Sequence, residues 1–388
     1  MKIALIILHA DPARGGAERY TVDLAAGLVS RGHDVSLLAC SFGNATAARQ
    51  VKLPARSATR LGQYLAFLDA VEAHLSTEHY DIVHAMLPVR QCDVYHPHAG
   101  LAAEAVVTGH LKYDGHRKSL AALTNRFNRK RRKFATIERQ LLDALNPPVV
   151  LCLSEYIKNT VRRLYTLPDE KLATLFNAVD LGKFDSARAP LAGDLIRDKF
   201  GLNQAVVGLI IAQDFQRKGL AEAIQALEGL DRRLVLLVVG KQKPAAYEQL
   251  AARVGVKDRV IFAGATNDPY SFYRAADFFV LPTRHDPCSL VVLESLAMGV
   301  PVISTIFNGA CEIMTEGVHG FVLQEARDVG ALHERYIRML DDAKRKRMSE
   351  ACLELRPQLA QEHHLDRLLA VYQECVNREM SLRPFRRN

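Results

Sequence analysis

Short apolar runs alternate with helix-like segments along almost the whole chain, and this alternation limits the fold more than any other feature. One helix-like segment is Glu18–Val29, in which Tyr20, Leu24 and Leu28 recur at helical spacing. The strand-like runs are Ile3–Leu8, Val35–Ala39, Ile82–Ala85, Val149–Leu153, Val206–Ala212, Leu234–Val239, Val260–Phe262, Phe278–Leu281 and Val300–Ser304. The pattern predicts an α/β fold of parallel sheets with helices on both faces.

The length of the chain predicts two domains, because 388 residues exceed the roughly 100–200 residues of a typical single domain. We expect residues 1–175 to form an N-terminal Rossmann-like domain and residues 176–364 a C-terminal one. A helical tail over residues 365–388 would cross back to the first domain. Doubly wound sheets bind ligands at the carboxyl ends of their strands, so two of them predict an active site in a shared cleft.

The composition favours a cytoplasmic enzyme. Hydrophobic residues make up 49% of the chain and charged residues 24%, which is typical of soluble globular proteins. There is no run of about 18 apolar residues that could span a membrane. The seven cysteines are scattered without a CxxC pair, which indicates reduced thiols rather than a zinc site or a disulfide framework.

The positive charge is concentrated in one segment. Between Lys112 and Arg139, ten Lys and Arg residues face two acids, Asp114 and Glu138, so the segment carries 10 − 2 = +8. The whole chain also carries +8, and the remainder is therefore neutral. A concentrated basic segment indicates an anionic partner surface.

Two clusters stand where a phosphate-binding site is expected. Gly15 and Gly16 lie between the first strand and the first helix, where the backbone can approach a ligand and helix amides can meet an anion. Arg217 and Lys218 follow the strand-like run Val206–Ala212, and together they can hold a diphosphate. Taken alone, the glycines also fit a structural turn, and the basic pair fits a solvated loop.

The strongest cluster is a pair of carboxylates around a helix start. Asp286 is expected on a loop after the run Phe278–Leu281, and Glu294 inside the following helix among apolar neighbours. Asp286 can accept hydrogen bonds from sugar hydroxyls, and Glu294 from a ribose diol. Ser289 and the residues after it can offer helix N-terminal amides to phosphate.

His96 and His98 straddle a proline and are a further candidate pair. A structural turn explains them equally well. Metal binding is disfavoured because no carboxylate or thiol stands at a suitable spacing. We therefore expect no metal and no other cofactor.

Taken together, these motifs resemble the retaining family-4 glycosyltransferases of the GT-B fold. The resemblance rests on Gly15-Gly16, the stretch Phe176–Asp180, Arg217-Lys218-Gly219, and Asp286 with Glu294. More narrowly, Asp93-Val94-Tyr95 and the stretch Val238–Pro244 resemble the lipopolysaccharide core glucosyltransferases that act on heptose. The resemblance covers nearly the whole chain.

The resemblance implies a role for each matching residue. The N-terminal domain would bind the acceptor and the C-terminal domain the nucleotide-sugar. Asp286 would bind the donor sugar, Glu294 the ribose, and His98, chosen over His96, would lie near the reacting carbons. The remaining donor contacts would come from Gly15, Gly16, Arg217, Lys218, Ser289, Leu290 and Val291. The sequence departs from the family at Asp286, where Glu is usual, and the His-Pro-His pattern is not clear in the narrower group.

The implied activity is transfer of a hexose, expected to be glucose from UDP-glucose, to a lipid-linked or lipopolysaccharide-core saccharide with retention of configuration. Leu120, Leu123, Phe127 and Phe134 recur at helical spacing within the basic segment 112–139, which predicts an amphipathic helix on an anionic membrane. The enzyme would then sit peripherally on the inner face of the cell membrane, with no nucleic-acid partner. Three alternatives remain open at this stage: a sugar-nucleotide epimerase, a glucan phosphorylase using pyridoxal phosphate, and a basic nucleic-acid-binding protein.

Overall fold

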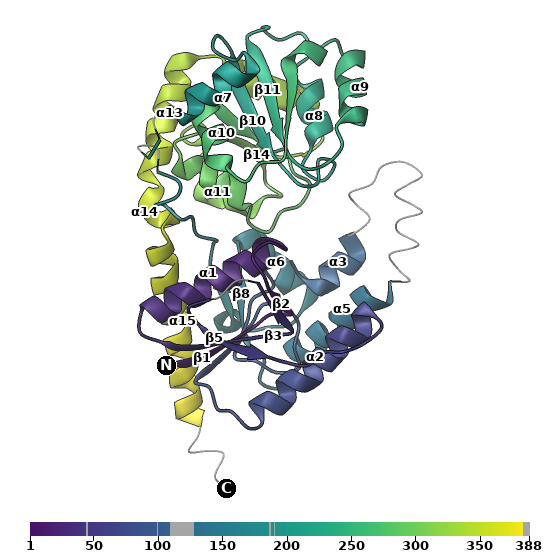
Figure 1. Cartoon of the computed structure of the whole chain (residues 1–388), viewed down its shortest axis with the longest axis vertical. Helices are drawn as coiled ribbons and strands as arrows, with labels where there is room; N and C mark the ends of the chain where they lie inside the picture. Colours follow the sequence, from purple (N-terminus) through teal and green to yellow (C-terminus); the bar gives the residue numbers. More distant parts are fainter. Residues whose placement is uncertain (44–45, 99, 109–127, 186–187, 190, 383–388) are drawn as a thin grey trace. The chain divides into compact units, whose positions relative to one another are not determined.

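The computed structural model describes residues 1–43, 46–98, 100–108, 128–185, 188–189 and 191–382 (Figure 1). The chain divides into two compact units, Met1–Leu175 with Leu365–Asn388, and Phe176–His364. These ranges coincide with the two domains expected from the sequence. The functions assigned to each domain stay predictions.

Unit 1 is built on a parallel sheet whose described strands follow the order β5-β3-β1-β6-β7-β8-β9. The chain order reverses direction between β1 and β6, so the topological switch point lies at this pair. Two short strands form a separate parallel pair: β2 (His9–Ala10), which follows β1 in the chain, and β4 (Ser41–Phe42), which follows β3. The sheet strands are β1 (Lys2–Ile6), β3 (Asp34–Ala39), β5 (Arg49–Lys52), β6 (Ile82–Ala85), β7 (Val94–Tyr95), β8 (Val149–Cys152) and β9 (Leu172–Thr174).

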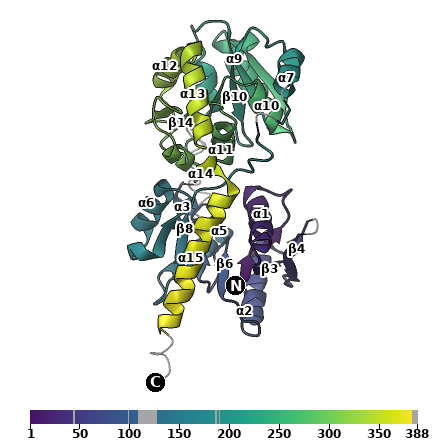
Figure 2. The same cartoon turned by 90° about the vertical axis from the view of Figure 1, so that its left-hand side faces the viewer.

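Helices cover both faces of the unit 1 sheet (Figures 1 and 2). On one face α1 (Gly16–Ser30) and the C-terminal helix α15 (Gln361–Leu382) bury Leu24, Leu368 and Tyr372. The hydroxyl of Tyr372 lies 2.6 Å from Nδ1 of His84 on β6, which fixes α15 to this sheet. The helices of the other face are α2 (Arg60–Leu75), α5 (Arg129–Leu142) and α6 (Glu155–Leu164), and α3 (Ala102–Thr108) packs on α5.

Unit 2 contains a second parallel sheet, with the order β12-β11-β10-β13-β14-β15 among its described strands. The order reverses between β10 and β13, which places the switch point of this unit there. The strands are β10 (Val206–Ile211), β11 (Leu234–Val239), β12 (Val260–Gly264), β13 (Phe278–Val280), β14 (Val302–Thr305) and β15 (Gly320–Leu323). The helices are α7 (Ala192–Phe200), α8 (Leu220–Gln225), α9 (Ala245–Arg253), α10 (Pro269–Ala275), α11 (Leu290–Ala297), α12 (Val329–Met339), α13 (Asp342–Glu354) and α14 (Arg356–Leu359).

The predicted fold class, two doubly wound Rossmann-like domains, is confirmed. Every strand-like run of the sequence analysis forms a strand, and β6 and β11 have the predicted bounds. The sequence analysis missed short or polar strands such as β5 and β7. β5 reads Arg-Gln-Val-Lys and lies at the sheet edge, where exposure removes the apolar signal.

Candidate active site

The switch point of unit 2 brings together residues that lie far apart in the sequence. Arg217 and Lys218 follow β10, and Asp286 follows β13, the strand beside it. Parallel neighbouring strands end at the same edge, so their loops meet there. This edge is where an open α/β sheet binds its ligand.

Gly219 allows the two loops to approach. It has φ +76°, and a Cβ atom at this position would lie 2.2 Å from the carbonyl oxygen of Pro282. Any other residue would be strained and would collide with backbone. Glycine therefore holds the preceding Lys218 against the loop that carries Asp286.

Lys218 and Asp286 form a buried ion pair, in which the Lys218 ammonium donates to Oδ2 of Asp286. Each residue is only 8% exposed. Burial lowers the pKa of Lys218, while the charge of Asp286 opposes that shift. Burial would raise the pKa of Asp286, but the charge and hydrogen bond of Lys218, with Arg217 and Ser289, lower it below its usual value. The pair thus holds a cation and a carboxylate at one point.

Arg217 lies beside this pair and is partly exposed. Its Nη1 donates to the carbonyl oxygen of His285 at 2.7 Å, and its Nε lies 3.8 Å from Oδ2 of Asp214. Burial lowers the pKa of the neighbouring His285; the charge of Asp286 opposes that shift, and the cations Arg217 and Lys218 add to it. Arg217 and Lys218 thus bring two cationic donors to this edge, each beside a carboxylate, and such donors can bind an anionic group.

The helix α11 supplies further donors. Ser289 is its N-cap residue, and the Ser289 N–H donates to Oδ1 of Asn308 at 3.2 Å. The Ser289 amide thus has an acceptor within the protein, and the predicted contact of Ser289 with the donor stays a prediction. Leu290 and Val291 form the first turn, where helix geometry provides no intrahelical acceptor for the amides.

Glu294 lies in α11 as predicted, and the structure adds a partner that the sequence did not reveal. The hydroxyl of Tyr273 on α10 donates to Oε2 of Glu294 at 2.9 Å and lies 3.0 Å from the carbonyl oxygen of Val291. The Tyr273 ring is fully buried, with Phe184 and Phe279 beside it at centroid distances of 6.0 Å. Burial, and then Glu294, raises the pKa of Tyr273 well above its usual value, so the phenol remains a donor.

Two other contacts fix the loop before α11. Arg284 donates to Oε1 of the buried Glu222 on α8 at 2.7 Å. Asn177 donates from Nδ2 to the carbonyl oxygen of Cys288 at 2.9 Å. The stretch Phe176–Asp180 thus contributes to the loop around Asp286, which the sequence pattern alone did not show.

In unit 1, Gly15 and Gly16 begin α1 as predicted. Gly15 has φ 176°, an extended conformation open to any residue, so backbone strain does not require this glycine. A Cβ atom at Gly16 would meet nothing within 4 Å, which leaves open space beside the start of the helix. Their predicted contact with a ligand remains a prediction.

His96 and His98 lie in a cluster of rings at the end of β7. His96 is fully buried, with His84 stacked at 5.5 Å and the Tyr20 edge at 5.2 Å between ring centroids. His98 is 9% exposed and lies 4.3 Å from Tyr20. His98 is the less buried of the two, and its choice over His96 stays a prediction.

The basic segment differs in part from its predicted form. Residues 109–127, including Leu120, Leu123 and Phe127, lie outside the described residues. α5 begins at Arg129, and its Phe134 ring stacks on Tyr64 at 3.9 Å and packs against the core. Assigning Phe134 to a membrane-facing side was therefore wrong. The exposed cations of α5 are Arg129, Lys130, Arg132 and Arg139.

Glu138, counted as an acid of the basic segment, is fully buried. Its Oε1 accepts from the Tyr95 hydroxyl at 2.5 Å and the Ala102 N–H at 2.8 Å. Its Oε2 accepts from the Ala103 N–H and the Tyr165 hydroxyl, each at 2.8 Å. This carboxylate joins α5 to the start of α3, so it does not offset the cations at the surface.

Within the described ranges, no group of three or more His, Cys, Asp or Glu side chains could hold a metal ion. None of the helices in those ranges is long and apolar enough to cross a membrane.

Comparison with known proteins identifies the family. Residues 14–183 match the family Glycosyltransferase Family 4, and residues 194–353 match the family Glycosyl transferases group 1. The first match covers β3 to β9 of the unit 1 sheet, and the second covers β10 to β15 of the unit 2 sheet. The chain belongs to these glycosyltransferases.

Similar proteins agree with this assignment. The lipopolysaccharide glucosyltransferase WaaG of Escherichia coli strain K12 is 27% identical over 327 residues, 82% of this chain and 84% of WaaG. The crystal structure of WaaG superposes with a TM-score of 0.76 at 24% identity, over 95% of this chain and 98% of that one. The structure of Anabaena HepE in complex with UDP-glucose superposes with a TM-score of 0.66 at 18% identity, over 98% and 100% of the two chains. The fold of this glycosyltransferase is thus shared with GT-B enzymes.

Proposed function

We propose that this glycosyltransferase moves glucose from UDP-glucose to a lipid-linked or lipopolysaccharide-core saccharide, with retention of anomeric configuration. The observation that carries the proposal is the Lys218–Asp286 ion pair at the switch point of unit 2. There the Lys218 ammonium, which can bind a phosphate, is in contact with the Asp286 carboxylate, which can accept hydrogen bonds from hydroxyls. A ligand whose phosphate adjoins a polyol would meet both groups, and a nucleotide-sugar is such a ligand.

Stabilisation of the leaving group is the main catalytic contribution in this proposal. As the bond between the sugar C1 and the diphosphate oxygen breaks, its electron pair stays on the diphosphate. Lys218, Arg217 and the amides of Leu290 and Val291 would neutralise that developing charge. Fixed donors in a buried site act more strongly than they would in water. No protein-bound metal or cofactor is part of the proposal.

Retention would follow from attack on the same face of the sugar from which the diphosphate leaves. The acceptor hydroxyl oxygen bonds to C1, and its proton passes to the departing phosphate oxygen. Asp286 would hold the sugar hydroxyls, His98 would lie near the reacting carbons, and Glu294 would hold the ribose. The names of WaaG and of the HepE complex with UDP-glucose support glucose and UDP as the first choices.

We further propose that the enzyme works at the inner face of the cell membrane through the basic segment. The exposed cations of α5 support this, since each Lys or Arg near an anionic leaflet contributes about 1 kcal/mol. A variant that tests the contribution, here called 4Q, replaces four cations near the start of α5 with Gln: the exposed Arg129 and Lys130 and the half-buried Arg131 and Lys133.

A donor panel tests the activity itself. Nucleotide release is measured with UDP-, GDP- and ADP-glucose and with UDP-galactose, in the presence of lipopolysaccharide-core acceptor, and the product is examined by proton NMR. We expect release with UDP-glucose and an α-linked product from the α-linked donor. An inverted product would refute retention, and release with another donor alone would refute the assigned base or sugar.

A further inference from the structure

Unit 1 contains a cavity of about 320 Å³ at the carboxyl edge of its sheet. Its walls come from the residues after β6, the end of β7, the start of α3 and the first turns of α5. About ten water molecules would fill this volume. The lining residues are Met86, Leu87, Pro88, Tyr95, Pro97, Gly100, Leu101, Ala102, Ala105, Asn128, Lys130, Arg131 and Phe134.

The wall of this cavity suits an apolar group rather than a sugar. Most of its side chains are aliphatic or aromatic, and the ring of Phe134 is held in place by stacking on Tyr64. The hydroxyl of Tyr95 already donates to Glu138 at 2.5 Å. A sugar hydroxyl buried against this wall would lose its water without gaining an equivalent partner, which is costly.

The mouth of the cavity is positively charged. Lys130 and Arg131 lie in the first turn of α5, which contains no acidic residue. The Lys130 ammonium lies 5.2 Å from the centre of the Phe134 ring. Partial burial lowers the pKa of Lys130, and the nearby charge of Arg60 adds to that shift, which shows that these cations repel each other. An anionic group would relieve this repulsion.

The cavity also adjoins the predicted reacting end of the acceptor site. Pro97 and Gly100 line it, and they flank His98 in the chain. The Pro97 carbonyl accepts from the Gly100 N–H at 2.8 Å, so the turn carrying His98 forms one wall. A ligand seated in the cavity would therefore extend past this turn.

We propose that the cavity binds the apolar part of an amphiphilic acceptor, with the acceptor's phosphate at Lys130 and Arg131 and its saccharide directed toward His98. This inference rests on the proposed function, because it takes the occupant to be the acceptor. The inference adds that the phosphate of the acceptor binds at the mouth of a defined cavity, and not only through general attraction to the cations of α5.

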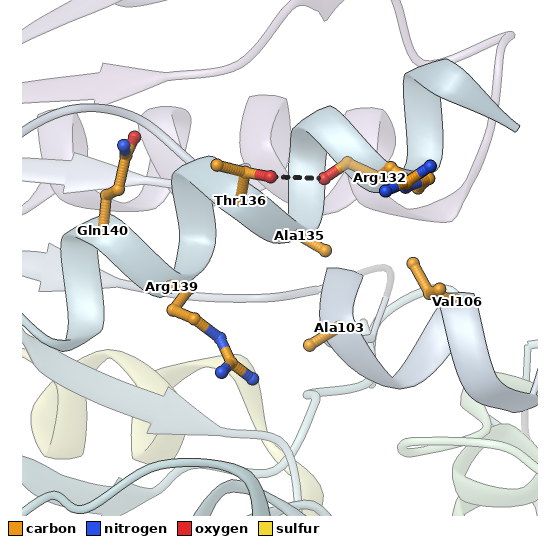
Figure 3. Close-up of a pocket in the computed structure, with 7 residues that line it drawn as sticks. All are labelled: Ala103, Val106, Arg132, Ala135, Thr136, Arg139 and Gln140. Atoms are coloured by element: carbon orange, nitrogen blue, oxygen red, sulfur yellow. Dashed lines mark hydrogen bonds between the residues drawn. The ribbon is translucent and has the colours of Figure 1, made fainter. Parts of the chain in front are cut away.

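A second cavity provides a matched control. It has a volume of about 400 Å³ and lies on another face of the same helices, between Ala103 and Val106 of α3 and Ala135 of α5 (Figure 3). Its arginines, Arg132 and Arg139, are as cationic as the mouth of the first cavity. Filling either cavity with Phe changes one alanine on the same pair of helices, Ala105 for the first and Ala135 for the second.

The experiment measures binding of monomeric decyl phosphate to the full chain by calorimetry, without membranes. We expect saturable binding by the wild type, with inorganic phosphate and decanol each at least tenfold weaker. Ala105→Phe should weaken decyl phosphate binding at least tenfold, and Ala135→Phe less than twofold. Lys130→Gln, which removes one charge at the mouth, should weaken it severalfold and reduce its salt dependence, with the melting temperature as the check that the variant is folded.

Equal binding by Ala105→Phe and the wild type would overturn the inference, as would equal losses in the two Phe variants. An affinity for decyl phosphate no higher than the affinity for inorganic phosphate would also overturn the inference. The proposed function fails separately, if UDP-glucose releases no UDP with any acceptor. An enzyme that is active on delipidated saccharide, with the KM of the lipid-linked form, would keep the function and refute the cavity.

Discussion

Replacing Tyr273 with Phe tests whether the donor site depends on a residue that touches no substrate. The change removes the hydroxyl that donates to Glu294 Oε2 at 2.9 Å and lies 3.0 Å from the Val291 carbonyl oxygen. The ring is fully buried between other aromatic residues, and Phe keeps its volume. The substitution therefore leaves the packing intact and frees one carboxylate oxygen from its donor.

The size of the effect follows from the charge of the acceptor. A hydrogen bond to a charged group contributes about 1.5–3 kcal/mol. Part of this free energy is lost from the stability of the fold. The other part is lost from ribose binding, because Glu294 is oriented less well toward the ribose. If half of it reaches the ligand, the Kd of UDP rises about three- to twelvefold, since 1.4 kcal/mol corresponds to a factor of ten.

The assay compares UDP with 2′,3′-dideoxy-UDP by calorimetry, because only UDP carries the diol. We expect the wild type to prefer UDP, and Tyr273→Phe to lose most of that preference while binding the dideoxy compound as before. Tyr270→Phe is the control, since Tyr270 is a buried tyrosine of the same helix whose hydroxyl accepts from the Ala189 N–H at 3.1 Å. An unchanged preference in Tyr273→Phe, or an equal loss in Tyr270→Phe, would refute the reasoning.

The other predictions concern the two carboxylates and the basic helix. Glu294→Gln should weaken UDP binding, whereas Asp286→Asn should spare it and lower turnover of UDP-glucose; equal loss of UDP affinity in both would contradict the assigned roles. Because Lys218 and Arg217 lower the pKa of Asp286, its ion pair stabilises the fold above about pH 4 and is lost as the pH falls through the lowered pKa. The difference in unfolding free energy between wild type and Asp286→Asn, measured with urea, should therefore shrink in acid, and a constant difference would contradict the ion pair. The 4Q variant should bind anionic vesicles more weakly by a few kcal/mol at low salt, at about 1 kcal/mol per charge, and keep UDP-glucose hydrolysis in solution; unchanged vesicle binding, or tight salt-sensitive RNA binding by the wild type, would point to another partner.

The sequence predicted the sheets because their strands are buried and parallel. β6 and β11 are short apolar runs with clear ends, and their bounds were predicted to the residue. β5 could not be found in this way, because its Arg-Gln-Val-Lys sequence lies at a sheet edge and carries no apolar pattern. A strand shows an apolar pattern because it is buried, so an exposed strand has little apolar pattern to detect.

The candidate site was predictable only where one segment carries the chemistry. Lys218 and Asp286 were each found from their local motifs, but their pairing depends on β10 and β13 being neighbours, which no local pattern states. Tyr273 resembles any core tyrosine in the sequence, and only the fold brings its hydroxyl to Glu294.

The basic segment also shows what a local sequence pattern cannot predict. The spacing of Phe134 predicted an apolar side for a membrane, yet its ring faces Tyr64 in the core. Glu138 was counted in the charge of the basic segment, although four hydrogen bonds hold it in the core. Helical spacing identifies a face of a helix but not what covers that face.

The most direct test of the central claim is UDP release from UDP-glucose by the wild type and by Lys218→Ala, with lipopolysaccharide-core acceptor present. Removing the ammonium takes away the group proposed to neutralise the leaving diphosphate, and loss of one such donor typically lowers kcat about 10²–10³-fold. Circular dichroism and the melting temperature confirm that the variant is folded. We predict a fall in kcat of that size in a folded protein. Near-normal turnover by folded Lys218→Ala would contradict the account of this site.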